Sequence, residues 1–273
     1  MKTLPSFLTL ALATAALTAA DIDPELMQSA HRFETTLTQK VSLQYLRYVP
    51  DGYEADKSRE WPLILFLHGA GERGDDLKKV AVHGPPKLVS KQARGREGET
   101  AGQKAARLEA IALLKQNFIV ISPQCPKDTH WHANEIAALL DEIERTHRVD
   151  TKRIYLTGLS MGGYGTWDLG LSQPERFAAL APICGGLNTI APKLNRRHPT
   201  RAKIQKNLPI WVFHGEKDST VEPEESRRGV ELLKRLGNKK IKLTTYPEAG
   251  HDSWTATYEN PELYRWFLVN PKP

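Results

Sequence analysis

Residues 153–163 read Arg-Ile-Tyr-Leu-Thr-Gly-Leu-Ser-Met-Gly-Gly, and this stretch decides the fold. Residues 154–157 favour a buried strand, and helix-compatible sequence runs from 164 to 171. Between them lies the G-x-S-x-G pattern, in which a strand turns sharply into a helix and presents a serine. Glycine is needed at 158 and 162 because so tight a turn leaves no room for a Cβ atom. We therefore predict an α/β fold with Ser160 at the end of a strand. The alternative interpretation is an ordinary glycine-rich turn.

A serine hydroxyl is a poor nucleophile near neutral pH, so Ser160 needs a base, and the base needs an orienting carboxylate. In this fold the acid and then the histidine follow the serine along the chain. Residues 208–215 read as a buried strand with Asp218 on the loop after it. His251 follows another predicted strand and is the only one of nine histidines C-terminal to Asp218. The pattern predicts a Ser160–His251–Asp218 triad.

Two neighbouring carboxylates are alternatives for the acid. Glu216 and Glu222 lie on the same predicted loop as Asp218. Asp218 is favoured because it stands just past the C-terminal end of the strand, where this fold places its acid. For His251 the alternative is a surface loop histidine.

An oxyanion hole requires two backbone donors near the serine. Residues 61–67 form a continuous apolar run, typical of a strand buried on both faces, and end in His-Gly-Ala-Gly-Glu-Arg-Gly at 68–74. We predict the N–H groups of Ala70 and Met161 as the donors, since the fold takes one from this loop and one from the residue after the nucleophile. The alternative, a phosphate cradle, lacks both glycine-rich phosphate patterns.

Strand and helix patterns alternate along the chain. An antiparallel pair is predicted at 32–38 and 42–49. Further strands are predicted at 63–67, 118–122, 154–157, 178–184, 210–213 and 241–246, and helices at 105–115, 134–146, 164–171 and 261–268. Such alternation is typical of a mostly parallel sheet with helices on both faces. Residues 87–107 read as an insertion, and its glycine-rich part at 95–102 is predicted to be flexible.

The N-terminal 20 residues have a cationic start, an apolar run and a small-residue end, as in a signal peptide. The alternative is a buried N-terminal helix. The apolar run is too short to span a bilayer. We predict a secreted or periplasmic protein with no membrane span and a single catalytic domain over 21–273.

Charge and cysteine content exclude some classes of partner. A net charge of +6 spread over 273 residues does not argue for nucleic-acid binding. The two cysteines, Cys125 and Cys184, follow predicted strands that are not neighbours, so we expect free thiols rather than a disulfide. Neither cysteine has metal-ligand spacing, and we predict no metal and no cofactor. No pattern indicates the oligomeric state.

Together these motifs resemble the α/β-hydrolase superfamily. Within it they are similar to secreted carboxylesterases of the polyhydroxybutyrate-depolymerase, feruloyl-esterase and acetyl-xylan-esterase type, bordering on prolyl-oligopeptidase-like hydrolases. The resemblance covers about residues 40–270 and is carried by 67–74, 122–126, 158–163, 213–218 and 250–254. It implies an eight-stranded sheet and acyl transfer to water, with Ser160 as nucleophile, Asp218 as acid and His251 as base. The insertion at 87–107 departs from the compact family pattern.

Two tryptophans are candidates for substrate contacts. Trp131 follows the fourth predicted strand and should lie on the catalytic face, and Trp254 stands three residues past His251. Either ring could stack on an aromatic acyl group or a sugar, or could simply pack in the core or rim. We expect a small-molecule or polysaccharide-linked carboxylic ester, such as an acetyl or feruloyl ester of a carbohydrate. A serine peptidase acting on small peptides would share the triad, and a non-catalytic binding protein is disfavoured because all three members are present.

Overall fold

The computed structural model describes residues 22–23, 28–29 and 32–273. The expected signal peptide at 1–20 lies outside the described residues. The chain divides into two units, Met1–Lys40 and Val41–Pro273. In the first unit, the short strands β1 (Ile22–Asp23) and β2 (Gln28–Ser29) pair antiparallel.

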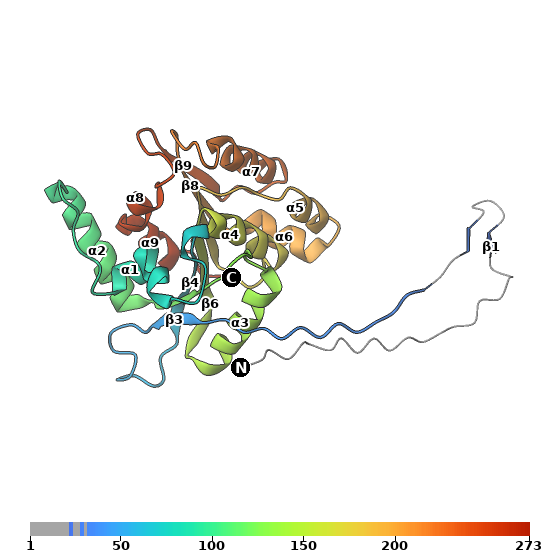
Figure 1. Ribbon diagram of the computed structural model, residues 1–273, viewed down its shortest axis with the longest axis horizontal. Coiled ribbons are helices and arrows are strands. Elements are labelled where there is room, and N and C mark those ends of the chain that lie inside the picture. Colours follow the sequence, from blue (N-terminus) through green and yellow to red (C-terminus); the bar gives the residue numbers. More distant parts are fainter. Residues whose placement is uncertain (1–21, 24–27, 30–31) are drawn as a thin grey trace, which may run out of the picture. The chain divides into compact units, whose positions relative to one another are not determined.

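A seven-stranded sheet forms the second unit, in the order β3-β5-β4-β6-β7-β8-β9 (Figure 1). Its strands are β3 (Tyr45–Tyr48), β4 (Trp61–Leu67), β5 (Ile119–Pro123), β6 (Val149–Leu159), β7 (Ala179–Ile183), β8 (Ile210–Gly215) and β9 (Ile241–Tyr246). Only β3 runs antiparallel to its neighbour, and the remaining pairs are parallel. The predicted mostly parallel α/β-hydrolase fold is confirmed, with seven strands in this described sheet instead of eight.

Helices cover both faces of this sheet (Figure 1). They are η1 (Ala70–Glu72), η2 (Leu77–Val82), α1 (Gly84–Val89), α2 (Ala101–Asn117), α3 (Ala133–Thr146), α4 (Met161–Ser172), α5 (Ile190–Asn195), α6 (Pro199–Asn207), α7 (Pro223–Arg235), α8 (Trp254–Tyr258) and α9 (Pro261–Leu268). Successive side chains of β4 point to opposite faces, as in any strand. Leu63 and Leu65 join a core with α3, α4 and α7, whereas Ile64 and Phe66 join a second core with α1, α2, α8 and α9.

The predicted strand at 32–38 is wrong. The structure has no strand between 32 and 44, and β3 pairs with β5 instead. The segment has two large apolar side chains, Phe33 and Leu37, which are 84% and 88% exposed. Without burial of that face, alternation alone does not stabilise a strand.

The insertion at 87–107 has helical residues at both of its ends. Its first residues belong to α1, and α2 begins at Ala101 with a capping box between Thr100 and Gln103. Glu99 and Arg107 are both almost fully buried and form a two-pronged pair, with Nε to Oε1 at 2.7 Å and Nη2 to Oε2 at 2.9 Å. Arg107 also donates to the Ala93 carbonyl. The glycine-rich part is thereby tied to the helix that follows it.

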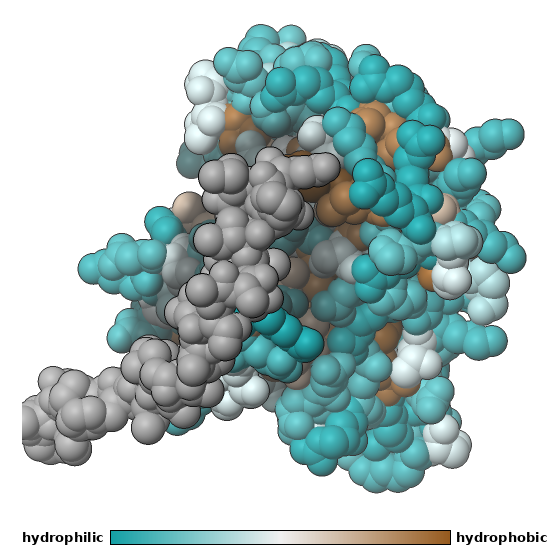
Figure 2. Space-filling model, turned by 90° about the vertical axis from the view of Figure 1, so that its right-hand side faces the viewer, coloured by the Kyte–Doolittle hydropathy of each residue, from teal (hydrophilic) through white to brown (hydrophobic). Residues whose placement is uncertain are grey.

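Both cysteines are buried and unpaired, which confirms the prediction of free thiols. Among the described residues, no helix combines the length and apolarity needed to cross a membrane. The face seen in Figure 2 is mostly hydrophilic, and hydrophobic residues show on it only in small areas.

Candidate active site

The turn from β6 into α4 places Ser160 at the C-terminal edge of the sheet. Ser160 has φ +52°, in the left-handed region that serine rarely adopts. The turn is held because the Ser160 N–H donates to the Ile183 carbonyl at 3.0 Å. A Cβ at Gly158 would overlap the Gly162 carbonyl, and one at Gly162 would overlap the Leu67 carbonyl. Both glycines are therefore required for the elbow to form against β4.

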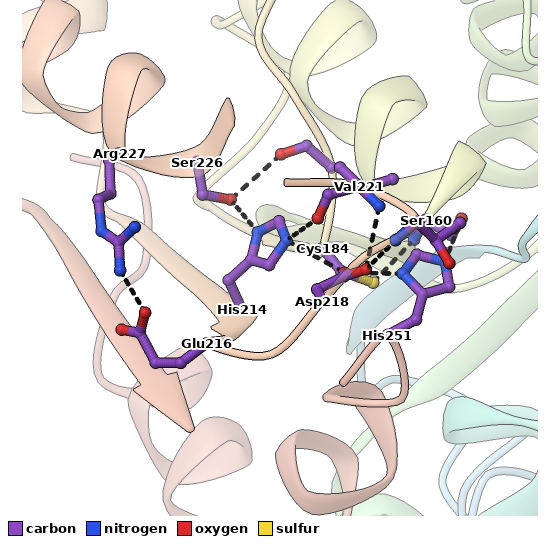
Figure 3. Close-up of polar contacts among 11 residues, drawn as sticks. Ser160, Cys184, His214, Glu216, Asp218, Val221, Ser226, Arg227 and His251 are labelled. Carbon is purple, nitrogen blue, oxygen red and sulfur yellow. Dashed lines mark hydrogen bonds and ion pairs between the residues drawn. The ribbon is translucent and has the colours of Figure 1, made fainter. Parts of the chain in front are cut away.

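The structure brings the three predicted triad residues together from three strand ends (Figure 3). His251, on the loop after β9, has Nε2 at 2.9 Å from Ser160 Oγ. Its Nδ1 lies 2.7 Å from Oδ2 of Asp218, on the loop after β8. These contacts assign the tautomer in which Nδ1–H donates to Asp218 and Nε2 accepts from the serine hydroxyl. The loops after β8 and β9 pack closely because residue 215 is glycine, with the Gly250 carbonyl where a Cβ would stand.

Asp218 is buried and fully hydrogen-bonded. Its Oδ1 accepts from the backbone N–H groups of Thr220 and Val221 at 2.9 and 3.0 Å, while Oδ2 accepts from His251. Burial by itself would raise the pKa of Asp218, but the hydrogen bonds from His251 and the two backbone groups outweigh it and leave the pKa below its ordinary value. The competing Glu216 pairs instead with Arg227, away from His251 (Figure 3). The carboxylate beside His251 is therefore ionised at neutral pH.

His214 is a neighbour of this site that sequence reasoning missed as a site residue. It is fully buried in β8, and its Nε2 lies 3.2 Å from Asp218 Oδ2 and 2.9 Å from the Val221 carbonyl. Its Nδ1 contacts Ser226 Oγ at 2.7 Å. A histidine inside a buried strand, four residues before the candidate acid, was the available signal, since a buried imidazole needs polar partners. Through these contacts the His214 ring stabilises the loop that carries Asp218.

Cys184 lies beneath the triad, at the end of β7. Its φ is +40°, and its Sγ accepts from the Ser160 N–H at 3.3 Å. Burial raises the pKa of this thiol to about 12, so it is neutral at physiological pH. Among the described residues, Cys184, Asp218 and His251 are the one group whose donor atoms lie within 4.8 Å of one another, as metal ligands would. The imidazole and carboxylate of that group already bond to each other.

The loop after β4 passes directly beside Ser160. A Cβ at Gly69 would lie 3.6 Å from the Ser160 Cβ, so the predicted donor Ala70 follows a residue in contact with the nucleophile. Ala70 begins η1 and Met161 begins α4. The first N–H groups of a helix lack intrahelical acceptors, so both predicted donors stand where N–H groups are open to a ligand.

His68 fixes this loop from within the core. Its Nδ1 contacts the Gly69 carbonyl at 2.6 Å and its Nε2 accepts from the Cys125 N–H at 3.0 Å, the pattern of a neutral ring. Burial lowers the pKa of His68 to about 4. Trp131 donates from Nε1 to the His68 carbonyl at 3.0 Å and is only 6% exposed. The structure thus places Trp131 mainly as a support for this loop.

Trp254 packs on the candidate base. Its ring lies edge-on to His251, with centroids 5.2 Å apart, and its Nε1 donates to His83 Nδ1 at 3.3 Å. Both polar and apolar parts of Trp254 are therefore engaged by protein groups, and it does not line the pocket that contains Ser160.

A pocket of about 580 Å³ opens at Ser160. It is lined by His130, Trp131, His132, Ala133, Ser160, Met161, Tyr164, Gly165, Asp168, Gly186 and Asn188. Tyr164, 42% exposed, is the open aromatic ring in this pocket. Sequence reasoning missed Tyr164 because it considered the two tryptophans near the strand ends and read residues 164–171 only as a helix.

Comparison with known proteins agrees with this geometry. The family model described as phospholipase/carboxylesterase matches residues 53–260. Acyl-protein thioesterase 1 of Gibberella zeae is 30% identical over 231 residues, covering 79% of this chain and 94% of that protein. Poly(3-hydroxyalkanoate) depolymerase C of Paucimonas lemoignei is 27% identical over 230 residues, covering 71% and 48%.

Among solved structures, one described as a thermostable esterase has a TM-score of 0.65 and 30% identity, covering 92% of this chain and 62% of that one. The chain spans less than half the length of most of the curated relatives compared with it. The family match extends from before β4 to after α8 and includes the serine turn and both loops that contact it. The chain belongs to the phospholipase/carboxylesterase family of α/β-hydrolases.

Proposed function

We propose that this protein is an exported serine hydrolase that cleaves carboxylic esters through an acyl-enzyme. The observation that carries the proposal is the unbroken hydrogen-bond chain from Ser160 through His251 to the buried carboxylate of Asp218. Membership of the phospholipase/carboxylesterase family supports ester hydrolysis as the reaction class.

In the first step His251 Nε2 takes the proton of Ser160 as Oγ attacks the ester carbonyl carbon. The resulting imidazolium is stabilised by the ionised Asp218. The negative oxygen is stabilised by the N–H groups of Ala70 and Met161, which act best because they are fixed before the reaction. His251 then protonates the alcohol oxygen as the C–O bond breaks, and the alcohol leaves.

In the second step water attacks the acyl-enzyme. His251 removes a proton from the water, and the same backbone groups stabilise the second tetrahedral oxyanion. Collapse of this intermediate breaks the bond to Ser160 Oγ, and the serine recovers its proton from His251. The carboxylic acid is released and the triad is restored without a cofactor.

The substrate is an ester of a small molecule or a polysaccharide, with acetyl and feruloyl esters of carbohydrates as the specific expectation. Export to the periplasm or the exterior is proposed from residues 1–20. A polymeric substrate outside the cell would agree with both expectations.

The test is hydrolysis of 4-nitrophenyl esters from acetate to decanoate, and of methyl ferulate, by the wild-type protein and its Ser160→Ala variant. We expect kcat to fall by about 10⁶-fold in the variant, the scale of losing a triad nucleophile. Ser172→Ala, at the far end of the same helix, is the matched control and should keep full activity. Turnover that survives in Ser160→Ala would refute the mechanism, and faster cleavage of a matched 4-nitroanilide would favour a peptidase.

A further inference from the structure

We propose that the pocket running away from Ser160 along α4 is a subsite for a sugar ring, with Tyr164 as its stacking platform and Asp168 and Asn188 as its hydroxyl-binding groups. The inference rests on the proposed ester hydrolysis and assigns the glycosyl part of the substrate to these residues.

One face of α4 contributes much of the pocket lining. Met161, Tyr164, Gly165 and Asp168 line the pocket and stand at helical positions i, i+3, i+4 and i+7, which share a face. At 1.5 Å per residue, this stripe extends about 10 Å from the nucleophile. The lining also includes residues 130–133, at and before the start of α3, and Gly186 and Asn188, from the segment between β7 and α5. The length and the volume of about 580 Å³ suit a group bound beside the reacting ester.

Tyr164 is held ready for stacking. A Cβ at residue 186 would lie only 2.7 Å from Tyr164 Cε1, so glycine at this position lets the ring rest directly on the backbone. The ring nevertheless remains 42% exposed. A supported but open aromatic ring loses little freedom on binding, which favours contact with the flat C–H face of a sugar. Trp131 is only 6% exposed and Trp254 does not line this pocket, so neither offers such a surface.

Asp168 and Asn188 supply complementary hydrogen-bonding groups. In the part of the chain that the structure describes, the exposed carboxylate of Asp168 has no ion-pair or hydrogen-bond partner. Asn188 Oδ1 accepts from the Ile190 N–H at 3.0 Å, which leaves its amide N–H groups for a ligand. A hydroxyl both donates and accepts, so a carboxylate beside an amide donor suits a polyol.

The polar groups within a mixed polar and apolar lining disfavour a long aliphatic chain as the occupant. His130 and His132 also line the pocket, with ring centroids 4.3 Å apart, and both are exposed. Burying these groups against hydrocarbon would remove their hydration without replacing it. Sugar hydroxyls can replace it.

The test compares kcat/KM for methyl ferulate and for feruloyl arabinose, which share an acyl group and differ in the alcohol. Tyr164→Ala should lower kcat/KM for the sugar ester about fivefold relative to the methyl ester, mostly through KM, since a stacking contact is worth about 1 kcal/mol. Tyr164→Phe keeps the ring and should preserve the wild-type ratio. Asp168→Asn should lower the ratio as well, and Asp75→Asn, an exposed site outside the pocket, should not.

A binding measurement separates this inference from the proposed reaction. Xylotriose contains no ester, so calorimetric titration into the folded Ser160→Ala protein should show binding that Tyr164→Ala removes. If the wild-type protein cleaves no ester but this binding is seen, the proposed function fails and the sugar subsite stands. If esters are cleaved but xylotriose does not bind and Tyr164→Ala leaves the substrate ratio unchanged, the sugar subsite is wrong. A selective loss of decanoate cleavage in Tyr164→Ala would instead identify an acyl-chain site.

Discussion

At the scale of single residues, Asp218 shows how one side chain can be both buried and charged. Its two oxygens accept from two backbone N–H groups and one imidazole, and a second imidazole, His214, lies behind it. Replacing the Asp218 carboxylate by a neutral amide would leave the geometry largely intact. It would change which nitrogen of His251 carries the proton.

Asp218→Asn should lower kcat for ester hydrolysis by about 10⁴-fold, because an amide at this position favours the wrong tautomer of the histidine. Steady-state kinetics on 4-nitrophenyl acetate would measure the effect. The matched control is Asp252→Asn, next to His251, where the carboxylate only accepts from Thr255. Equal losses in both variants would mean that Asp218 has no special role.

The same carboxylate predicts a dependence of stability on pH. Because the pKa of Asp218 is lower in the folded state, its ionised form stabilises the fold fully above the unfolded value of about 3.9, and this stabilisation is lost as pH falls through the folded pKa. Between about pH 5 and pH 3, the urea midpoint of the wild type should therefore fall more than that of Asp218→Asn. Parallel curves would contradict the assigned hydrogen bonds.

The serine turn gives a steric prediction. Gly162→Ala would push a methyl group into the Leu67 carbonyl, which belongs to a buried strand and cannot move away. We expect a loss of activity together with a lower Tm, measured by differential scanning calorimetry. Gly102→Ala, a helical position with open space around the Cβ, should keep full activity and should not lower Tm, since alanine is the better helix former.

At the scale of elements, the start of α2 matters because it anchors the segment before it. Thr100 Oγ1 accepts from the Gln103 N–H, and Gln103 Oε1 accepts from the Thr100 N–H. Glu99, just before this box, pairs with Arg107 inside α2. The cap and the ion pair together define where the connection from α1 ends.

Thr100→Ala should reduce the free energy of unfolding by about 1 kcal/mol, the usual effect of losing an N-cap side chain. In a domain of this size, that corresponds to a Tm lower by about 2–4 °C. Thr100→Ser keeps the accepting oxygen and should restore most of the difference. An unchanged Tm in Thr100→Ala would show that the helix start is held by other contacts.

These elements also show what can be read from sequence. The core strands and the approach of Ser160, Asp218 and His251 were predictable because continuous apolar runs mark buried strands and the fold fixes the order of the residues after them. The Glu99–Arg107 pair was not, because its formation depends on how α2 orients two long side chains. The prediction of a strand at 32–38 was wrong for another reason. Its alternating apolar side chains have no surface to pack against.

The candidate pocket, too, could be predicted only in part from the sequence. Chain order located Ser160, but whether Trp131 or Tyr164 faces the open space depends on side-chain burial and on a glycine at 186, far along the chain. Neither periodicity nor spacing reports such a contact.

At the scale of the whole second unit, the sheet separates two apolar cores, and both cysteines lie inside them. Burial raises the pKa of Cys125 to about 11 and that of Cys184 to about 12. The reactive thiolate is therefore almost absent at neutral pH, and the side chains are also shielded from reagents.

Iodoacetamide at about pH 8 should leave the native protein unmodified, since this pH is well below both thiol pKa values. In guanidinium chloride, where the pKa of each thiol returns to about 8.5, both cysteines should react. Intact-protein mass spectrometry distinguishes the outcomes. Rapid labelling of the native protein would contradict the burial of Cys125 and Cys184.

The reacting groups lie close together in space but far apart along the chain. Ser160 precedes α5 and α6, whereas Asp218 and His251 both follow them. Residues 196–198 between these helices are exposed. A polypeptide cut there would leave the nucleophile on one fragment and its acid and base on the other. Hydrolysis of a chromogenic ester would then require the two fragments to associate. The same fold could thus serve as a split reporter of protein association.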